Sequence, residues 1–214
     1  MNKKRIEYCR QLVNNCPKRD SPLKIREALE CAVALNPESE VAYSSLANVY
    51  EMEGNTDKAK QVVEDCLRLA NPKSCASSYY LGTINYKEGN YDQALRFLQN
   101  CLDIDPNDGD ALGAMALCYA NMGEKEKEKE INFEIIKSPG VSNRVLCQAY
   151  CNLGIMHAGE DAEMMYYENS LKADPDSLPT MHNLGGAYAR RNEWDKAIII
   201  FQRVVKDLVK NDEE

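Results

Sequence analysis

Thiols and imidazoles are the side chains of this sequence best suited to nucleophilic or metal chemistry. The chain has nine cysteines and two histidines, His157 and His182. Zinc sites use such ligands at short helical spacings, and Cys147 and Cys151 have the i, i+4 spacing. On the same helix, however, His157 would lie about 240° further round the helix axis than Cys151, so its side chain would point to a different side. No second cysteine pair follows. The pattern predicts no metal site and no cofactor.

A cysteine–histidine nucleophile is the other chemistry to test. Cys151 and His182 fall at equivalent places of two predicted helices, and packed helices lie roughly 8–10 Å apart. A nucleophile also needs a third group that orients the base and donors for the oxyanion, and the sequence supplies neither. No Gly-x-x-x-x-Gly-Lys phosphate loop is present. We therefore expect a chain that is not an enzyme.

Composition narrows the class of partner. The chain is 44% hydrophobic and 28% charged, as in a folded protein, with a net charge of −8. Nucleic-acid binders need a basic surface, so we expect no nucleic-acid partner. No apolar run approaches the roughly 20 residues that span a bilayer; residues 197–201, for example, form a run of only five. The basic N-terminus is not followed by an apolar segment. We expect no membrane insertion and a cytoplasmic or nuclear location.

The elements that position these residues repeat along the chain. A leucine precedes a small residue in Leu46-Ala47, Leu81-Gly82 and Leu184-Gly185, and an alanine follows twelve places later in each case. Tyrosines, hairpin glycines and a closing proline keep the same register. This pattern resembles the tetratricopeptide repeat (TPR) family, in which each repeat is a hairpin of two helices, A and B. The register gives one array over residues 1–214 with six repeats, at 6–39, 40–73, 75–108, 109–142, 147–177 and 178–211.

The resemblance implies an all-α fold, a right-handed superhelical solenoid whose A helices line a concave groove. In repeat three, Ser78, Leu81, Gly82 and Asn85 would face Ala94, Leu98, Cys101 and Leu102 of helix B. Cys66 and Cys101 share a register position with Ala32 and Ser170, so we interpret both thiols as small packing residues.

Two repeats depart from the pattern. Repeat four has Glu128 where Ala59, Ala94 and Ala197 stand, within an alternating charged run that is typical of a solvated helix. Repeat five is three residues shorter between its leucine and its proline, so we expect a shortened hairpin turn around Gly159-Glu160-Asp161.

The resemblance also assigns groove positions on helix A. They are occupied by polar and aromatic residues in repeats two, three, five and six: Asn48, Tyr79, Tyr80, Thr83, Tyr86, Asn152, His182, Asn183 and Arg190. Asn152 and Asn183 share one register, which resembles the asparagine ladder that holds a peptide backbone in some TPR proteins. Two alternatives stay open: the amides are simply solvated, or Tyr79 and Tyr80 pack between helices. No register completes the Lys, Asn, Asn, Lys, Arg clamp for a chaperone tail.

The last predicted helix is apolar on several sides. Phe201, Val205, Leu208 and Val209 would lie on the face that a further repeat normally covers. Three explanations stay open: the helix self-associates, the chain is part of a longer protein, or Lys206, Asp207 and Lys210 form a sufficient polar cap.

The sequence therefore favours a non-catalytic scaffold or adaptor that binds a protein or peptide partner in the concave groove. The alternative is a structural TPR subunit that forms a homodimer through its C-terminal helix. An enzyme or metalloprotein is a remote third reading.

Overall fold

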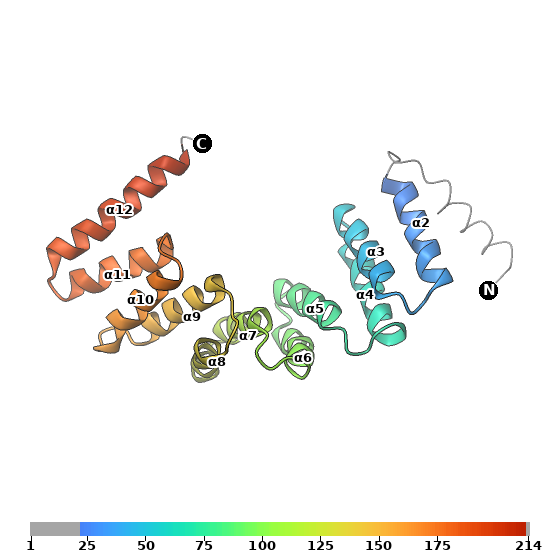
Figure 1. Cartoon of the computed structure of the whole chain (residues 1–214), viewed down its shortest axis with the longest axis horizontal. Helices are drawn as coiled ribbons and strands as arrows, with labels where there is room; N and C mark the ends of the chain where they lie inside the picture. The colour runs from blue at the N-terminus through green and yellow to red at the C-terminus, as the bar shows by residue number, and fades with distance from the viewer. Residues whose placement is uncertain (1–21, 213–214) are drawn as a thin grey trace. The chain divides into compact units, whose positions relative to one another are not determined.

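The computed structural model describes the backbone of residues 22–212 and the side chains of residues 25–206. Over that range the chain forms eleven helices and no strand: α2 (Pro22–Leu35), α3 (Glu40–Met52), α4 (Thr56–Leu69), α5 (Cys75–Lys87), α6 (Tyr91–Leu102), α7 (Gly109–Met122), α8 (Lys125–Lys137), α9 (Asn143–Met156), α10 (Ala162–Ala173), α11 (Leu178–Arg190) and α12 (Trp194–Asp212). The predicted all-α fold is confirmed (Figure 1).

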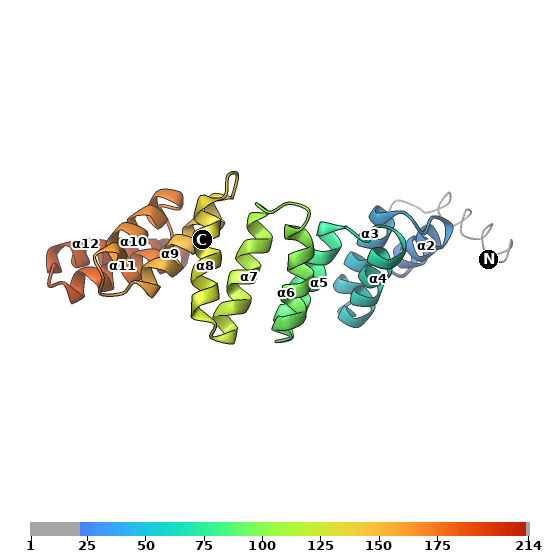
Figure 2. The ribbon, with the colours of Figure 1, turned by 90° about the horizontal axis from the view of Figure 1, so that it is seen from below.

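The helices form two compact units, which divide after Ile104. Unit 1 contains α2 and the hairpins α3/α4 and α5/α6. Unit 2 contains the hairpins α7/α8, α9/α10 and α11/α12. The two helices of each hairpin run side by side in both views (Figures 1 and 2). The first helix predicted for repeat one lies outside the described residues, and the assignment of all six repeats to one array stays a prediction.

Local sequence signals explain where the helices begin. Ser39, Asn55, Ser74 and Asp108 each precede a helix, and each side chain accepts a hydrogen bond from the amide three residues later. These four residues are N-caps, which satisfy amides that have no partner inside the helix.

The hairpin turns need one residue in the left-handed region. Gly54, Gly89 and Gly123 adopt φ values between +73° and +80° at equivalent positions, and Asn192 takes that place in the last hairpin with φ +61°. Glycine suits this conformation because it has no Cβ. In the α9/α10 hairpin the left-handed residue is Gly159, two places earlier in register. The turn predicted to be short is therefore closed by a different residue.

Close approach of the paired helices depends on a small residue in helix A. A Cβ added at Gly82, Gly154 or Gly185 would lie 2.9 Å or less from Leu98, Tyr167 or Phe201 of helix B. Ser78, Leu81, Ala94, Leu98 and Cys101 are buried, as the repeat predicted. The same contact thus recurs in three of the hairpins.

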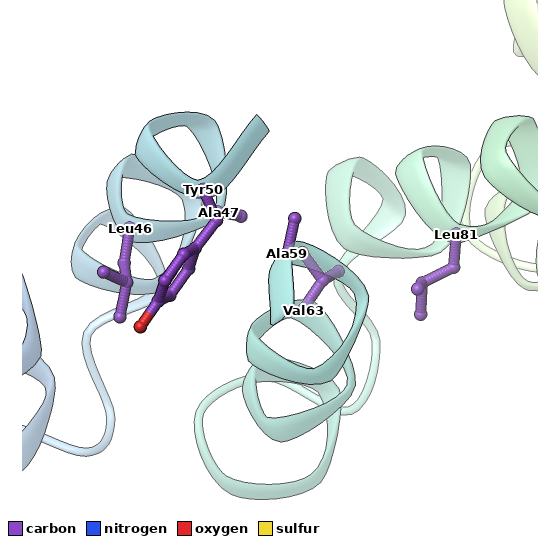
Figure 3. Packing of buried hydrophobic residues seen from close by; sticks show 6 residues of the cluster. All are labelled: Leu46, Ala47, Tyr50, Ala59, Val63 and Leu81. Carbon is purple, nitrogen blue, oxygen red and sulfur yellow. The ribbon is translucent and has the colours of Figure 1, made fainter. Parts of the chain in front are cut away.

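The core of unit 1 shows how neighbouring hairpins share their apolar residues. Figure 3 shows α4 between α3 and α5, with Ala59 and Val63 between Leu46, Ala47 and Tyr50 on one side and Leu81 on the other. All six residues are less than 7% exposed. One hairpin therefore completes the core of the next, as expected for a repeat architecture.

A tyrosine–lysine contact recurs in alternate hairpins. Tyr50, Tyr119 and Tyr188 end equivalent A helices, and a lysine eight residues later in each case, Lys58, Lys127 or Lys196, lies 5.2–5.5 Å from the ring centroid. Such cation–π contacts stabilise exposed sites by about 0.5–1 kcal/mol. In the α9/α10 hairpin, His157 occupies the tyrosine position, and its ring lies 5.2 Å from that of Tyr166.

Candidate functional site

The A helices of unit 2 present the best-connected set of predicted groove residues. Helix α9 contacts both α7 and α11, so the three A helices are neighbours. We define the A-helix face of unit 2 by residues at groove positions of these helices that are exposed or partly exposed: Leu117, Gln148, Asn152, Ile155, His182, Asn183 and Gly186. Leu117 is 43% and Ile155 51% exposed, so apolar area is available beside the polar groups.

Asn152 stands in a row of side-chain amides. Its Oδ1 accepts a hydrogen bond from Gln148 Nε2 at 2.8 Å, and its Nδ2 donates to Asn132 Oδ1 at 3.4 Å. Asn132 is only 1% exposed and also donates to the Glu128 carbonyl at 2.8 Å. The half-buried Asn152 is therefore held in place, while its oxygen and nitrogen each keep bonding capacity.

Asn183 and His182 lie one helix further along. Asn183 Nδ2 points to Cys151 Sγ at 3.6 Å, and the amide is half-buried. His182 is exposed, and its ring packs against Phe201 with the centroids 6.0 Å apart. The two predicted residues on α11 are thus partly oriented by their own chain and partly open to solvent.

Arg190 is exposed, but its guanidinium forms an ion pair with Glu163. Its Nη2 donates to Glu163 Oε1, and Glu163 is 1% exposed. The other oxygen of Glu163 accepts from the Gly159 amide at 2.9 Å in the short hairpin turn. Arg190 therefore links the last two hairpins and neutralises a buried carboxylate.

The remaining predicted groove residues belong to unit 1. Asn48 on α3 is exposed, while Tyr79, Tyr80, Thr83 and Tyr86 on α5 are all half-buried. Tyr80 packs against the core cluster of unit 1, and burial raises the pKa of its hydroxyl above the usual range. Thr83 Oγ1 donates to the Tyr80 carbonyl at 2.8 Å, and the Tyr86 ring lies 5.8 Å from that of Tyr91. Part of the Tyr80 side chain thus packs against the core, and the use of all five residues for binding stays a prediction.

Sequence reasoning misjudged the exposure of one carboxylate and missed a second. In repeat register Glu128 and Glu163 both occupy the small-residue position of helix B, where the other hairpins have Ala59, Ala94 and Ala197. The charged run around Glu128 suggested a solvated side chain, yet Glu128 is half-buried, and burial raises its carboxyl pKa. The same alignment across the short turn of repeat five would have identified Glu163.

Of the four apolar residues predicted for self-association on α12, Val205 is the one that the described part of the chain shows to be exposed. Phe201 packs over Gly185, whereas Val205 is 60% exposed. Trp194 and Ile198, on the same side of α12 as Val205, are 57% and 53% exposed. The side chains of Leu208 and Val209 lie outside the described residues.

The two cysteines with the i, i+4 spacing are placed for packing. Cys147 and Cys151 are buried, and Cys147 Sγ lies 3.2 Å from Ser170 Oγ. His157 Nδ1 lies 2.7 Å from Glu160 Oε2. Among the described residues, no three His, Cys, Asp or Glu side chains gather as a metal site would require, and no helix there is long and apolar enough to cross a membrane.

Comparison with known families identifies the architecture. Models of the tetratricopeptide repeat match residues 41–72, 85–127 and 180–214, together about half of the chain. The chain belongs to the tetratricopeptide repeat family. No curated protein sequence matches it.

Solved structures show the same fold at low identity. YrrB, a TPR protein with an unusual peptide-binding site, is 16% identical with a TM-score of 0.64, over 85% of this chain and 92% of its own. BtubC from P. vanneervenii is 18% identical with a TM-score of 0.65, over 99% and 89%. A TPR protein from Parabacteroides merdae is 15% identical with a TM-score of 0.65, over 95% and 78%.

Proposed function

We propose that the chain is a non-catalytic scaffold that binds an extended segment of a partner protein on the A-helix face of unit 2. The observation that carries this proposal is the pair of equivalent amides, Asn152 and Asn183, on neighbouring A helices. An extended peptide offers alternating N–H and C=O groups, and a side-chain amide can pair with either. YrrB, which has the same fold, is a TPR protein with a peptide-binding site, and this supports peptide binding by a chain of this architecture.

The rest of the face is consistent with peptide recognition. Gly186 and Ala189 on α11 leave the backbone of that helix accessible, and Leu117 and Ile155 provide apolar contacts for side chains of the segment. The side chains of the bound segment would determine which peptides bind. The amides of Asn152 and Asn183 and the apolar area of Leu117 and Ile155 would supply the affinity.

The test is a peptide selection with the intact chain as bait, followed by affinity measurements on the selected peptides. We expect Asn152→Ala and Asn183→Ala each to weaken binding roughly 10-fold, because each removes a hydrogen bond to the peptide backbone. Asn169→Ala is the matched control, since Asn169 lies on α10, the B helix of the same hairpin as Asn152. If both groove variants bind selected peptides as tightly as the wild type does, this face is not the peptide site.

Self-association is a second candidate, favoured by one observation. Trp194, Ile198 and Val205 are each more than half exposed on one side of α12. In unit 1 the residue equivalent to Val205 is Leu67, which is half-buried against the shared core. A second copy of α12 could cover the same apolar side.

A further inference from the structure

A cleft opens between the start of α8 and the end of α9, beside the A-helix face of unit 2. Its volume is about 380 Å³, and it is lined by charged residues of α8 and by the end of α9: Lys125, Glu126, Glu128, Lys129, Asn152, Ile155 and Met156. This volume is near the lower end of the roughly 300–1,000 Å³ of ligand pockets, which is enough for one long side chain. Asn152 and Ile155 belong to both the cleft and the A-helix face, so a bound segment would pass its mouth.

Glu128 supplies the distinctive chemistry of the cleft. Its carboxylate is half-buried, and among the described residues it has no ion pair or hydrogen bond. Burial disfavours the charged form and raises the pKa of Glu128, while the nearby charge of Lys125 lowers it. A partly desolvated carboxylate without a partner gains more from a cation than a solvated one does.

The next hairpin shows how the same position is satisfied within the chain. Glu163 occupies the small-residue position there, and its carboxylate is bound by the guanidinium of Arg190 from the following A helix. In repeat register the residue that follows Glu128 at the place of Arg190 is Gly159, in the shortened turn. The chain therefore provides an arginine for Glu163 and no side chain at the corresponding place for Glu128.

The lysines that line the cleft do not form with Glu128 the ion pair that Arg190 forms with Glu163. Arg26 pairs with Glu53 at 2.6 Å and Lys60 with Glu88 at 2.8 Å, each joining a B helix to the end of the next A helix. Lys129 and Glu160 stand at the same two register positions, and the charge of Lys129 acts on Glu160. Lys125 is exposed, and its charge lowers the pKa of Glu128, but no ion pair joins the two side chains in the part of the chain that the structure describes.

We propose that this cleft binds one arginine side chain of the partner segment, with its guanidinium on Glu128 and its aliphatic stem against Ile155 and Met156. The inference rests on the proposed function, because the arginine belongs to the segment on the A-helix face. A guanidinium suits the position because it is planar, stays charged and can donate two parallel hydrogen bonds to one carboxylate. Its methylene groups suit the apolar wall of α9.

The experiment titrates the isotopically labelled intact chain with N-acetyl-arginine methylamide and follows the Asn152 side-chain amide and the Ile155 and Met156 methyl groups by NMR. We expect saturable shifts at these three residues. The citrulline analogue, which has the same shape without the charge, should bind roughly tenfold more weakly. Glu128→Ala should weaken arginine binding by a similar factor. Glu130→Gln is the control, because Glu130 is an exposed carboxylate on the same helix.

Loss of folding will not obscure the result. Alanine is the residue at this position in three other hairpins, so Glu128→Ala should keep the spectrum dispersed and the unfolding midpoint at or above the wild-type value. The inference is overturned if no saturable shift occurs at the cleft, if citrulline binds as well as arginine, or if Glu128→Ala binds arginine normally. Selected peptides that need Asn152 and Asn183 but show no arginine preference would overturn the inference and leave the proposed function standing. Failure of every peptide on the A-helix face would overturn the proposed function itself.

Discussion

The small-residue position of helix B shows how one residue type can serve two purposes. Glu163 is almost completely buried and is satisfied by Arg190 and by the Gly159 amide. Glu128 is half-buried beside a cleft and has no such partner. Since a buried charge is tolerated only when it is paired, Glu163 is a structural residue. Glu128 remains available to a ligand.

Arg190→Ala tests the structural part of this contrast. The substitution leaves the Glu163 carboxylate buried with only one hydrogen bond, so we expect a loss of about 1–3 kcal/mol in the free energy of unfolding. Arg144→Ala is the control, because the Arg144–Asp110 pair is 3.3 Å long and both side chains are largely exposed. Exposed pairs contribute at most about 1 kcal/mol. Urea unfolding measures both variants, and equal losses would contradict the assignment of Arg190 to a buried pair.

Individual residues also show which contacts the sequence could predict and which it could not. The burial of Leu81, Ala94 and Cys101 follows directly from the repeat, because their register fixes which side of the helix they occupy. The Arg190–Glu163 pair could not be predicted in that way. It joins two hairpins, and the three-residue deletion in the turn hides the register of Glu163. The packing of Tyr80 depends on the position of the neighbouring hairpin, which a pattern within one repeat does not specify.

At the scale of the elements, the helix pair depends on one point of close contact. Gly185 and Gly186 are adjacent on α11 but face different surroundings. A Cβ at Gly185 would lie 2.8 Å from the Phe201 ring of α12, whereas a Cβ at Gly186 would meet only the Arg190 side chain at 3.6 Å. Alanine is a better helix former than glycine by about 1 kcal/mol, and that gain is available only where there is space.

Alanine substitutions at Gly185 and Gly186 should therefore change the free energy of unfolding in opposite directions. Gly185→Ala should lower the free energy of unfolding by about 1–3 kcal/mol, because Phe201 must move to make room. Gly186→Ala should raise it by up to about 1 kcal/mol. The measurement is again the urea midpoint, compared at constant slope. A stabilising Gly185→Ala would show that Phe201 yields easily and that the close contact does not define the hairpin.

At the scale of the whole molecule, neighbouring hairpins within each unit contact one another, and one side of α12 is exposed. A repeat array normally covers such a side with a further element or a polar cap. The exposed apolar residues of α12 include Trp194, Ile198 and Val205, which lie on one side of the helix, and Arg203 and Lys206 are also exposed. These apolar residues can therefore act beyond the single chain.

Light scattering and sedimentation test that reading. If α12 self-associates, the wild type should be a dimer at micromolar concentration, and Val205→Glu should convert it to a monomer by placing a charge in the apolar contact. Met165→Glu is the control, because Met165 is 50% exposed on α10. A wild-type monomer, or a dimer that Val205→Glu leaves intact, would remove α12 as a self-association surface.

The carboxylates at the small-residue position also bear on how such an array acquires new binding specificities. Alanine and glutamate codons differ by a single base, as in GCA and GAA, and the hairpins with Glu128 and Glu163 keep the same helix pairing as those with Ala59 or Ala94. One nucleotide change in a duplicated repeat can therefore add a carboxylate beside the binding surface without altering the scaffold. A later arginine in the next repeat can neutralise it. In this chain Arg190 neutralises Glu163, whereas Gly159 stands at the corresponding place after Glu128, so one scaffold carries both a neutralised and an unneutralised carboxylate at the same repeat position.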